Sequence, residues 1–194
     1  MRKVSVSRKT SETDIQITLD LDGSGKVDVE TGVGVFDHML HAFGRHGLFD
    51  LYVRVKGDTW IDTHHTVEDT GIVLGQAFAE ALGDKAGITR FADVALAMDE
   101  ALILGAVDIS GRGALYWDVD FVTPRLGEMD TEVIREFFIG LARDGRFTLH
   151  LKELAGENDH HVCEACFKAA GRALRFACEL DPRVQGIPST KGSL

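Results

Sequence analysis

Apolar and polar residues alternate along the segment TDIQITLDL, residues 13–21, and again along KVDVE, residues 26–30. A period of two is typical of a β-strand with one buried face, because successive side chains point to opposite sides of a sheet. The stretch DGSG between the two segments consists of residues that favour turns. The pattern therefore predicts a β-hairpin over residues 13–30.

The pattern changes near residue 36 to that of an amphipathic helix. Apolar residues recur three and four positions apart, at Phe36, Met39, Leu40 and Phe43. Gly47 is placed to end this helix. The strand LFDLYVRV follows, and then a longer helix that begins after the pair Asp62 and Thr63, whose side chains suit an N-cap. An apolar stripe along this helix indicates its buried face: Val67, Gly71, Leu74 and Phe78.

The chain then repeats this plan. The motif HHTVED, residues 64–69, has a near copy 96 residues later in HHVCEA, residues 160–165. The stretch DHMLHAFGRHGLFDLYV matches REFFIGLARDGRFTLHL at an offset of 98, and ETDIQITLDLDGSG matches EALILGAVDISGRG at an offset of 88. We therefore predict two half-domains, residues 1–88 and 89–180, followed by a C-terminal tail, residues 181–194. The predicted class is α/β (α+β), with each half a mostly antiparallel sheet covered by two helices and the halves related by a pseudo-twofold axis.

Composition narrows the class of protein. With 44% hydrophobic and 27% charged residues among 194, the chain is typical of a globular protein with a real core. It has no apolar run of about 18 residues and no signal-peptide pattern, so we expect a cytoplasmic protein that does not interact with a membrane. The net charge of -10 argues against a nucleic-acid partner, because binding phosphates requires clustered Lys and Arg.

The three cysteines fall in one predicted helix. Cys163 and Cys166 form a CxxC beside two histidines, so a zinc or redox site must be considered. These cysteines also lie on a helical apolar stripe, and zinc ribbons usually contain two such pairs. We therefore interpret Cys163, Cys166 and Cys178 as thiols of the core.

The repeated histidine motif is typical of a metal site. On a helix, His64 and His65 lie four and three positions before Glu68, so all three side chains can reach bound ions. His38 adds an imidazole upstream, and its repeat partner Glu136 adds a carboxylate. Imidazole and carboxylate without thiolate suit a divalent ion such as Mn, Fe, Co or Zn. Capping or solvated residues could give one such motif, and ferritin-like storage proteins also place Glu and His on helices, but the strand-rich plan argues against those proteins.

Several motifs together resemble the imidazoleglycerol-phosphate dehydratase family of histidine biosynthesis. They are FDHMLHAFGRHG, HHTVEDTGIVLGQA, MDEAL, DISGRG, GENDHHVCEACFKAAGRAL and the terminal STKG, and they extend over nearly the whole chain. The resemblance implies a duplicated fold of the ribosomal-protein S5 domain 2-like type and two manganese ions per active site. It also implies a homo-oligomer of 24 subunits whose sites form where subunits meet.

The resemblance also implies specific site residues. The family's metal ligands fall on His38, His64, His65, Glu68, His160, His161 and Glu164. Many members have His before FF, where this chain has Glu136 in REFF, and Glu can still ligate a hard ion such as Mn²⁺. The substrate-binding positions fall on Glu12, Arg90, Arg112, Ser189 and Lys191. Arg and Lys in this set suit a phosphorylated imidazole substrate.

The family reaction removes water from imidazoleglycerol phosphate and gives an enol that becomes imidazole acetol phosphate. Our hypothesis is that Glu164 or Glu68 carries the proton and that His46 or Asp99 acts as general acid for the leaving hydroxyl. Two other classes use similar ligands. A dinuclear metallohydrolase would not require an imidazole ring in its substrate, and a non-catalytic metal-storage shell would have no use for Arg90, Arg112 and Lys191.

Overall fold

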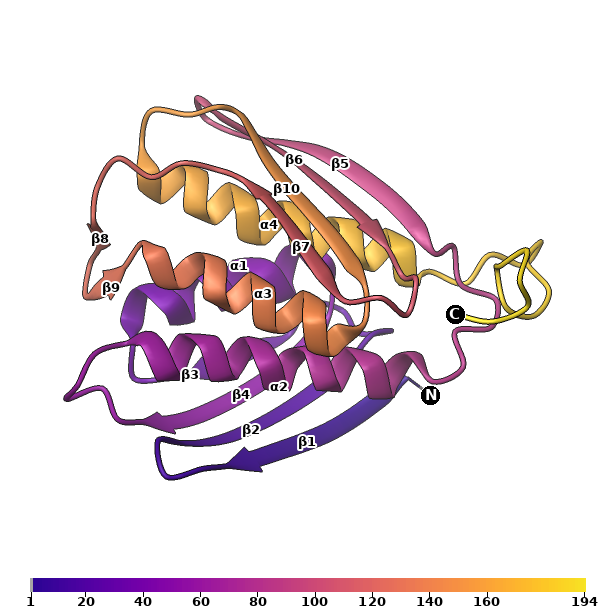
Figure 1. The fold of residues 1–194 in the computed structure, drawn as a ribbon, viewed down its shortest axis with the longest axis horizontal. Coiled ribbons are helices and arrows are strands. Elements are labelled where there is room, and N and C mark those ends of the chain that lie inside the picture. The colour runs from indigo at the N-terminus through magenta and orange to yellow at the C-terminus, as the bar shows by residue number, and fades with distance from the viewer. Residues whose placement is uncertain (1) are drawn as a thin grey trace.

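Two four-stranded sheets enclose a layer of four helices in the computed structural model, which describes residues 2–194 (Figure 1). The first sheet has the order β1 (Lys3–Lys9), β2 (Thr13–Asp20), β4 (Asp50–Gly57) and β3 (Val27–Glu30). The second has the order β5 (Phe91–Met98), β6 (Ala101–Asp108), β10 (Thr148–Ala155) and β7 (Ala114–Asp118). In each sheet the last of these strands pairs in parallel and the other pairings are antiparallel. The predicted α/β fold of duplicated, mostly antiparallel half-domains is therefore confirmed.

The predicted hairpin over residues 13–30 is wrong. Strand β2 pairs with β1 on one side and with β4 on the other, while β3 pairs in parallel with the far edge of β4. The carboxylate of Asp50 explains the difference, because it accepts hydrogen bonds from the backbone N–H groups of Ser24 (2.7 Å) and Lys26 (3.0 Å). The DGSG segment is thereby held over the start of β4 and leads the chain across the sheet instead of back along β2.

The four helices match the predicted periodicity. They are α1 (Gly34–Gly47), α2 (His64–Leu82), α3 (Glu132–Gly145) and α4 (Asp159–Cys178). The apolar positions predicted for the inner face of α1 are fully buried, and all positions of the predicted stripe of α2 are buried as well. Helix α1 ends at Gly47, as predicted, and α3 ends at Gly145. The residues that follow, Leu48 and Arg146, both adopt φ 55, in the left-handed region usually occupied by glycine.

The helices pair across the two halves. Helix α1 packs on α4, and α2 packs on α3. Glycines allow the close approach: a Cβ on Gly171 of α4 would lie 2.5 Å from the carbonyl oxygen of Phe43 in α1, and one on Gly75 of α2 would lie 2.7 Å from that of Leu141 in α3. The two contacts are equivalent under the sequence repeat. Each long helix is thus held against the short helix of the opposite half.

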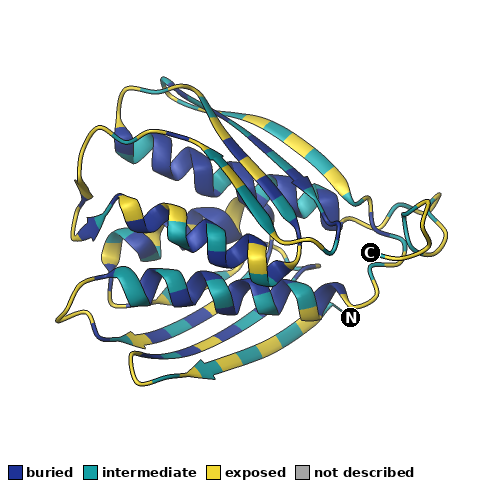
Figure 2. Cartoon of the chain, in the orientation of Figure 1, coloured by how far each residue is buried: buried dark blue, intermediate teal, exposed yellow. Residues whose placement is uncertain are grey.

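One core fills the space between the sheets. Figure 2 shows buried residues on the inner faces of both sheets and along the helices between them. Phe36, Phe137 and Phe167 bring α1, α3 and α4 together, with ring centroids 5.0 to 6.4 Å apart. Cys163, Cys166 and Cys178 lie in this core as free thiols with at most 1% exposure, which confirms their structural interpretation. Within residues 2–194, no helix is both long and apolar enough to cross a membrane.

The direction of the helices decides where the site can form. Helices α2, α3 and α4 all begin at the end of the molecule drawn on the left in Figure 1, and the C-terminal tail lies at the opposite end. A short ribbon of β8 (Arg125–Leu126) and β9 (Met129–Asp130) lies at the left end, just before α3. The first turns of α2 and α4 carry the HHxxE motifs, so both motifs lie at the same end of the molecule.

Candidate metal and active site

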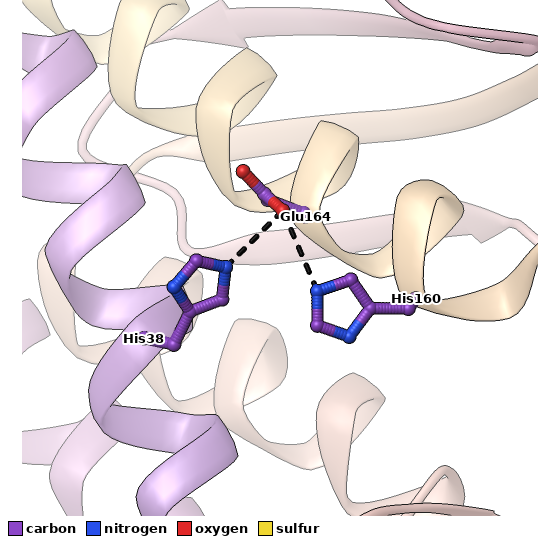
Figure 3. Close-up of side chains that lie close together, drawn as sticks. All are labelled: His38, His160 and Glu164. Carbon is purple, nitrogen blue, oxygen red and sulfur yellow. Dashed lines mark hydrogen bonds and ion pairs between the residues drawn. The ribbon is translucent and has the colours of Figure 1, made fainter.

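Three of the predicted ligands converge between α1 and α4. The Nε2 atom of His38 lies 3.2 Å from Oε2 of Glu164, and Nε2 of His160 lies 3.5 Å from the same oxygen (Figure 3). The two imidazole rings stack at a centroid distance of 5.5 Å. One donor atom from each residue lies within 4.8 Å of the others, and this is the sole cluster of three His, Cys, Asp or Glu with that property in residues 2–194. We call His38, His160 and Glu164 the trio.

Local sequence explains how the trio is held. Asn158 caps α4, because its side-chain oxygen accepts hydrogen bonds from the backbone N–H groups of His160 (2.9 Å) and His161 (3.4 Å). Glu164 lies four residues after His160, on the same face of the helix. The close packing at Gly171 then brings α1, and with it His38, alongside that face.

Glu164 is the buried member of the trio, with 8% exposure. Burial raises the pKa of its carboxyl, but Lys168 and His38 lower it by more, so the net pKa lies below its usual range. The Lys168 ammonium is the closest partner, 2.7 Å from Oε1. Glu164 therefore presents Oε2 to the two imidazoles while Oε1 is held by a cation, and the trio as a whole offers two imidazole nitrogens and a carboxylate oxygen. This donor set fits a divalent ion such as Mn²⁺ or Zn²⁺.

The first copy of the motif forms a matching pair within α2. His64 Nε2 lies 3.3 Å from Glu68 Oε2, and both side chains are more than one-third exposed, at 40% and 34%. Glu136, the repeat partner of His38, lies on α3, which packs on α2 as α1 packs on α4. In residues 2–194 the pair does not form a three-ligand cluster with Glu136. Glu136 instead lines a shallow hollow of about 400 Å³ with Trp117.

The second histidine of each motif is held by a carboxylate. His65 Nδ1 lies 2.9 Å from Asp58, with Glu12 3.8 Å from its Nε2. The hydrogen bond to Asp58 is the main cause of a raised His65 pKa. A carboxylate on Nδ1 fixes the ring and leaves Nε2 directed outward as a donor to a metal.

The same arrangement recurs in the second half. His161 Nδ1 lies 2.8 Å from Glu100, and its Nε2 lies 3.9 Å from Asp99. The hydrogen bond to Glu100 raises the His161 pKa, and the bond to His161 is the first cause that lowers the pKa of Glu100 to about 2. Asp99 adopts φ 49 in the turn between β5 and β6, and its side chain is 76% exposed. Asp99 thus lies beside His161 and outside the trio.

His46 occupies a different environment. It lies eight residues after His38 on α1, about 12 Å along the helix at about 1.5 Å per residue. Together with Lys168, Arg172 and residues 94–97 of β5 it lines a hollow of about 350 Å³. Burial, followed by the charges of Lys168 and Arg172, lowers the His46 pKa. The hollow is basic and borders the trio through Lys168.

The remaining predicted substrate ligands lie at the other end of the molecule. Arg90 donates to Asp108 and to the carbonyl oxygen of Pro188, both at 2.8 Å, and Arg112 lies 3.9 Å from the same Asp108. The tail carries Ser189, whose hydroxyl accepts from the backbone N–H of Lys191. This region lies at the end of α4, about 27 Å from His160 at about 1.5 Å per residue (Figure 1). A single chain therefore does not bring Arg90, Arg112, Ser189 and Lys191 to the trio.

Comparison with known proteins decides the family. A sequence model described as imidazoleglycerol-phosphate dehydratase matches residues 31–174, which is well over half of the chain. The chain belongs to the imidazoleglycerol-phosphate dehydratase family. The dehydratase of Acidiphilium cryptum is 61% identical over 194 residues, covering 100% of this chain and 99% of that protein. The dehydratase of Dinoroseobacter shibae is 57% identical over 195 residues, with both proteins covered completely.

Solved structures of the dehydratase family share the fold. The enzyme of Staphylococcus aureus superposes with a TM-score of 0.83 at 35% identity, covering 92% of this chain and 99% of that one. The enzyme of Pyrococcus furiosus in complex with (S)-C348 has a TM-score of 0.83 at 38% identity, covering 97% and 100%. Membership of a dehydratase family confirms the prediction of a carbon–oxygen lyase, and it argues against the metallohydrolase and storage-shell alternatives.

Some residues of the site carried no clear signal in the sequence. Asp58 lies in a loop with no repeat partner, and Lys168 and Arg172 follow the motif at ordinary helical spacing. Glu100 is different, because it is the repeat partner of Glu12 at an offset of 88. That relation could have identified Glu100 as the carboxylate beside the second motif.

Proposed function

We propose that this chain catalyses the dehydration of imidazoleglycerol phosphate to imidazole acetol phosphate, a step of histidine biosynthesis, with two divalent ions, Mn²⁺ by preference, at each active site. Family membership supports the reaction. The convergence of His38, His160 and Glu164 is the observation that supports the metal, because two imidazoles and a carboxylate that meet within 4.8 Å are a donor set for a divalent ion.

The chemistry explains why such a group would be needed. The reaction removes a proton from a carbon next to the imidazole ring, and the substrate offers no carbonyl group there to accept the negative charge. A divalent ion on a ring nitrogen would supply that stabilisation by favouring the imidazolate form. The remaining roles belong to side chains of this chain.

Glu164 is our candidate for the proton carrier, with Glu68 as its counterpart in the first copy. Its carboxylate is buried and faces the two imidazoles of the trio through Oε2. Its pKa lies below the usual range, so the group is ionised at neutral pH and its proton site is free. Glu12 would orient the substrate hydroxyls from beside His65. Asp99 and His46 are the candidates for general acid. Asp99 lies exposed beside His161, and His46 lies in the basic hollow that borders the trio, where burial lowers its pKa.

The separation of the candidate residues supports an assembly. The trio and both motifs lie at one end of the folded molecule, whereas Arg90 and Arg112 lie beside the C-terminal tail at the opposite end. A phosphate ester bound by those arginines cannot reach the trio of the same chain across about 27 Å. We therefore infer that a second copy completes each site in a homo-oligomer, with the predicted 24 subunits as our proposal for its size and the cytoplasm as its location.

The proposed function is tested by turnover of imidazoleglycerol phosphate with metal-stripped protein, with and without Mn²⁺. Activity should require the added ion. Glu164→Gln should abolish turnover, and Glu80→Gln, an exposed carboxylate on α2, serves as the matched control with normal turnover. If Glu164→Gln retains both manganese and near-normal turnover, the proton-carrier role is wrong.

The shared site is tested by complementation. Glu164→Gln and Arg90→Ala should each be inactive alone, because each removes one half of the site. Coassembly of the two inactive chains should recover activity, since some interfaces would join an intact metal half to an intact arginine half. Absence of recovery in a mixed particle, verified by mass spectrometry, would show that one chain supplies both halves.

A further inference from the structure

The two metal half-sites differ in one residue that directly contacts a ligand. In the second half, the Lys168 ammonium lies 2.7 Å from Oε1 of Glu164, and both side chains are largely buried, with 17% and 10% exposure. The repeat offset of 96 places Ile72 at the corresponding position of the first half. Glu68 therefore has no neighbouring cation one turn further along its helix.

The packing around the two positions explains why they can differ. A Cβ on Gly140 of α3 would lie 3.1 Å from Cγ1 of Ile72, so the Ile72 side chain is packed against the neighbouring helix. Lys168 instead extends toward β5, where its ammonium also lies 3.4 Å from the sulfur of Met98. Contacts with Glu164 and with Met98 at the end of β5 thus hold the Lys168 ammonium in place.

The charges of the two half-sites differ as a result. The trio contains one carboxylate, and Lys168 compensates its charge. The first half-site contains Glu68, with Glu136 on the adjacent helix in place of His38 and no compensating cation at residue 72. A divalent cation held by Glu68 therefore meets an uncompensated carboxylate, with the charge of Glu136 on the adjacent helix adding to the attraction, whereas Lys168 cancels the charge of Glu164 in the second half-site.

We infer that Lys168 is a built-in competitor for the cation at the trio, and that the half-site of α1 and α4 binds its divalent ion more weakly than the half-site of α2 and α3. Lys168 restricts Glu164 to one ligating oxygen and repels the ion, whereas Glu68 keeps both oxygens available. The inference rests on the proposed function, since it concerns the same two ions. It assigns Lys168 a role in setting the order in which they bind.

The size of the effect follows from the charges. An ammonium about 5 Å from a doubly charged ion, even in a water-like dielectric, weakens binding by about tenfold. Removing the charge should therefore tighten the weaker class of sites by about tenfold and leave the stronger class unchanged. Placing a lysine at residue 72 should weaken the stronger class by a similar factor.

The experiment is a titration of metal-stripped, assembled protein with Mn²⁺, followed by the electron paramagnetic resonance signal of the free ion and by calorimetry. Wild-type protein should show two classes of sites. Lys168→Met, which keeps the length of the side chain, should tighten the weaker class, and Lys168→Arg, which keeps the charge, should not. Arg172→Met is the matched control, because it removes a charge from the next turn of α4 without a contact to Glu164.

The outcomes separate this inference from the proposed function. Unchanged affinities in Lys168→Met, or equal tightening in Arg172→Met, would overturn the role of Lys168 while manganese binding itself persists. A single class of sites in the wild type would do the same. Ile72→Lys provides the reverse test if Lys168→Met does not assemble. A wild-type protein that binds no manganese would overturn the proposed function, and this inference with it.

Discussion

Replacing Gly171 by Ala should loosen the trio by forcing α1 and α4 apart. The added Cβ would lie 2.5 Å from the carbonyl oxygen of Phe43, 3.2 Å from its carbon and 3.4 Å from its Cα. These are backbone atoms, so no change of rotamer can relieve the clash. Reaching an ordinary contact of 3.4 Å requires the helices to separate locally by about 0.9 Å.

The free energy of unfolding should fall by an amount that two opposing effects determine. Overpacking costs about 1–3 kcal/mol, and a 2.5 Å contact with a rigid backbone belongs to the upper part of that range, at about 2–3 kcal/mol, whereas an Ala inside a helix gains about 1 kcal/mol over Gly. The net loss is about 1–2 kcal/mol, which corresponds to a fall in melting temperature of about 2–8 °C for a chain of this length. Because His38 moves with α1, affinity of the trio for Mn²⁺ should fall as well.

Two matched variants make this prediction specific. Gly75→Ala introduces the equivalent clash, 2.7 Å from the Leu141 carbonyl oxygen, between α2 and α3, so it should destabilise the fold by a similar amount and leave the trio intact. Gly34→Ala, whose Cβ meets only Glu128 at 3.5 Å, should be neutral. Calorimetric melting and Mn²⁺ titration measure the two effects. A Gly171→Ala protein that melts at the wild-type temperature, or loses no more Mn²⁺ affinity than Gly75→Ala, would refute the reasoning.

Three further predictions follow from local contacts. Asn158→Ala should lower the free energy of unfolding by about 1 kcal/mol through loss of the α4 cap, and Asn158→Ser should restore most of it, as measured by denaturant titration. Glu100→Gln should lower the His161 pKa, measured by NMR. The loss of stability in the Glu100→Gln variant should be largest between pH 4.5 and 6.5. It should fade at lower pH, where wild-type Glu100 becomes protonated toward its pKa of about 2, and at higher pH, where His161 loses its proton as the pH passes its raised pKa. A loss of stability that does not depend on pH would contradict this pairing. The buried thiols, with the Cys178 pKa raised to about 12 by burial, should resist a thiol reagent in native protein and all react once it unfolds; fast native labelling would disprove their burial.

The sequence determined the elements that depend on local periodicity. The helix spacing of Phe36, Met39 and Phe43 predicted the buried face of α1, and the same logic placed the cysteines in the core. The repeated HHxxE motif helped to predict the two half-domains and identified His160 and Glu164 of the trio, and His38 was singled out separately as the histidine upstream of the first copy. These predictions succeeded because a helix's buried face and its i,i+4 neighbours are fixed by its own geometry.

Tertiary structure decided the features that depend on pairing between distant segments. The partner of β2 could not be derived from the alternation of residues 13–30, because alternation shows which face is buried and not which strand lies alongside; the Asp50 carboxylate redirected the loop. Cross-half packing at Gly171 brought His38 to Glu164, 126 residues away. The fold likewise separated Arg90 from the trio, since that separation depends on how the elements lie in space rather than on the order of residues along the chain.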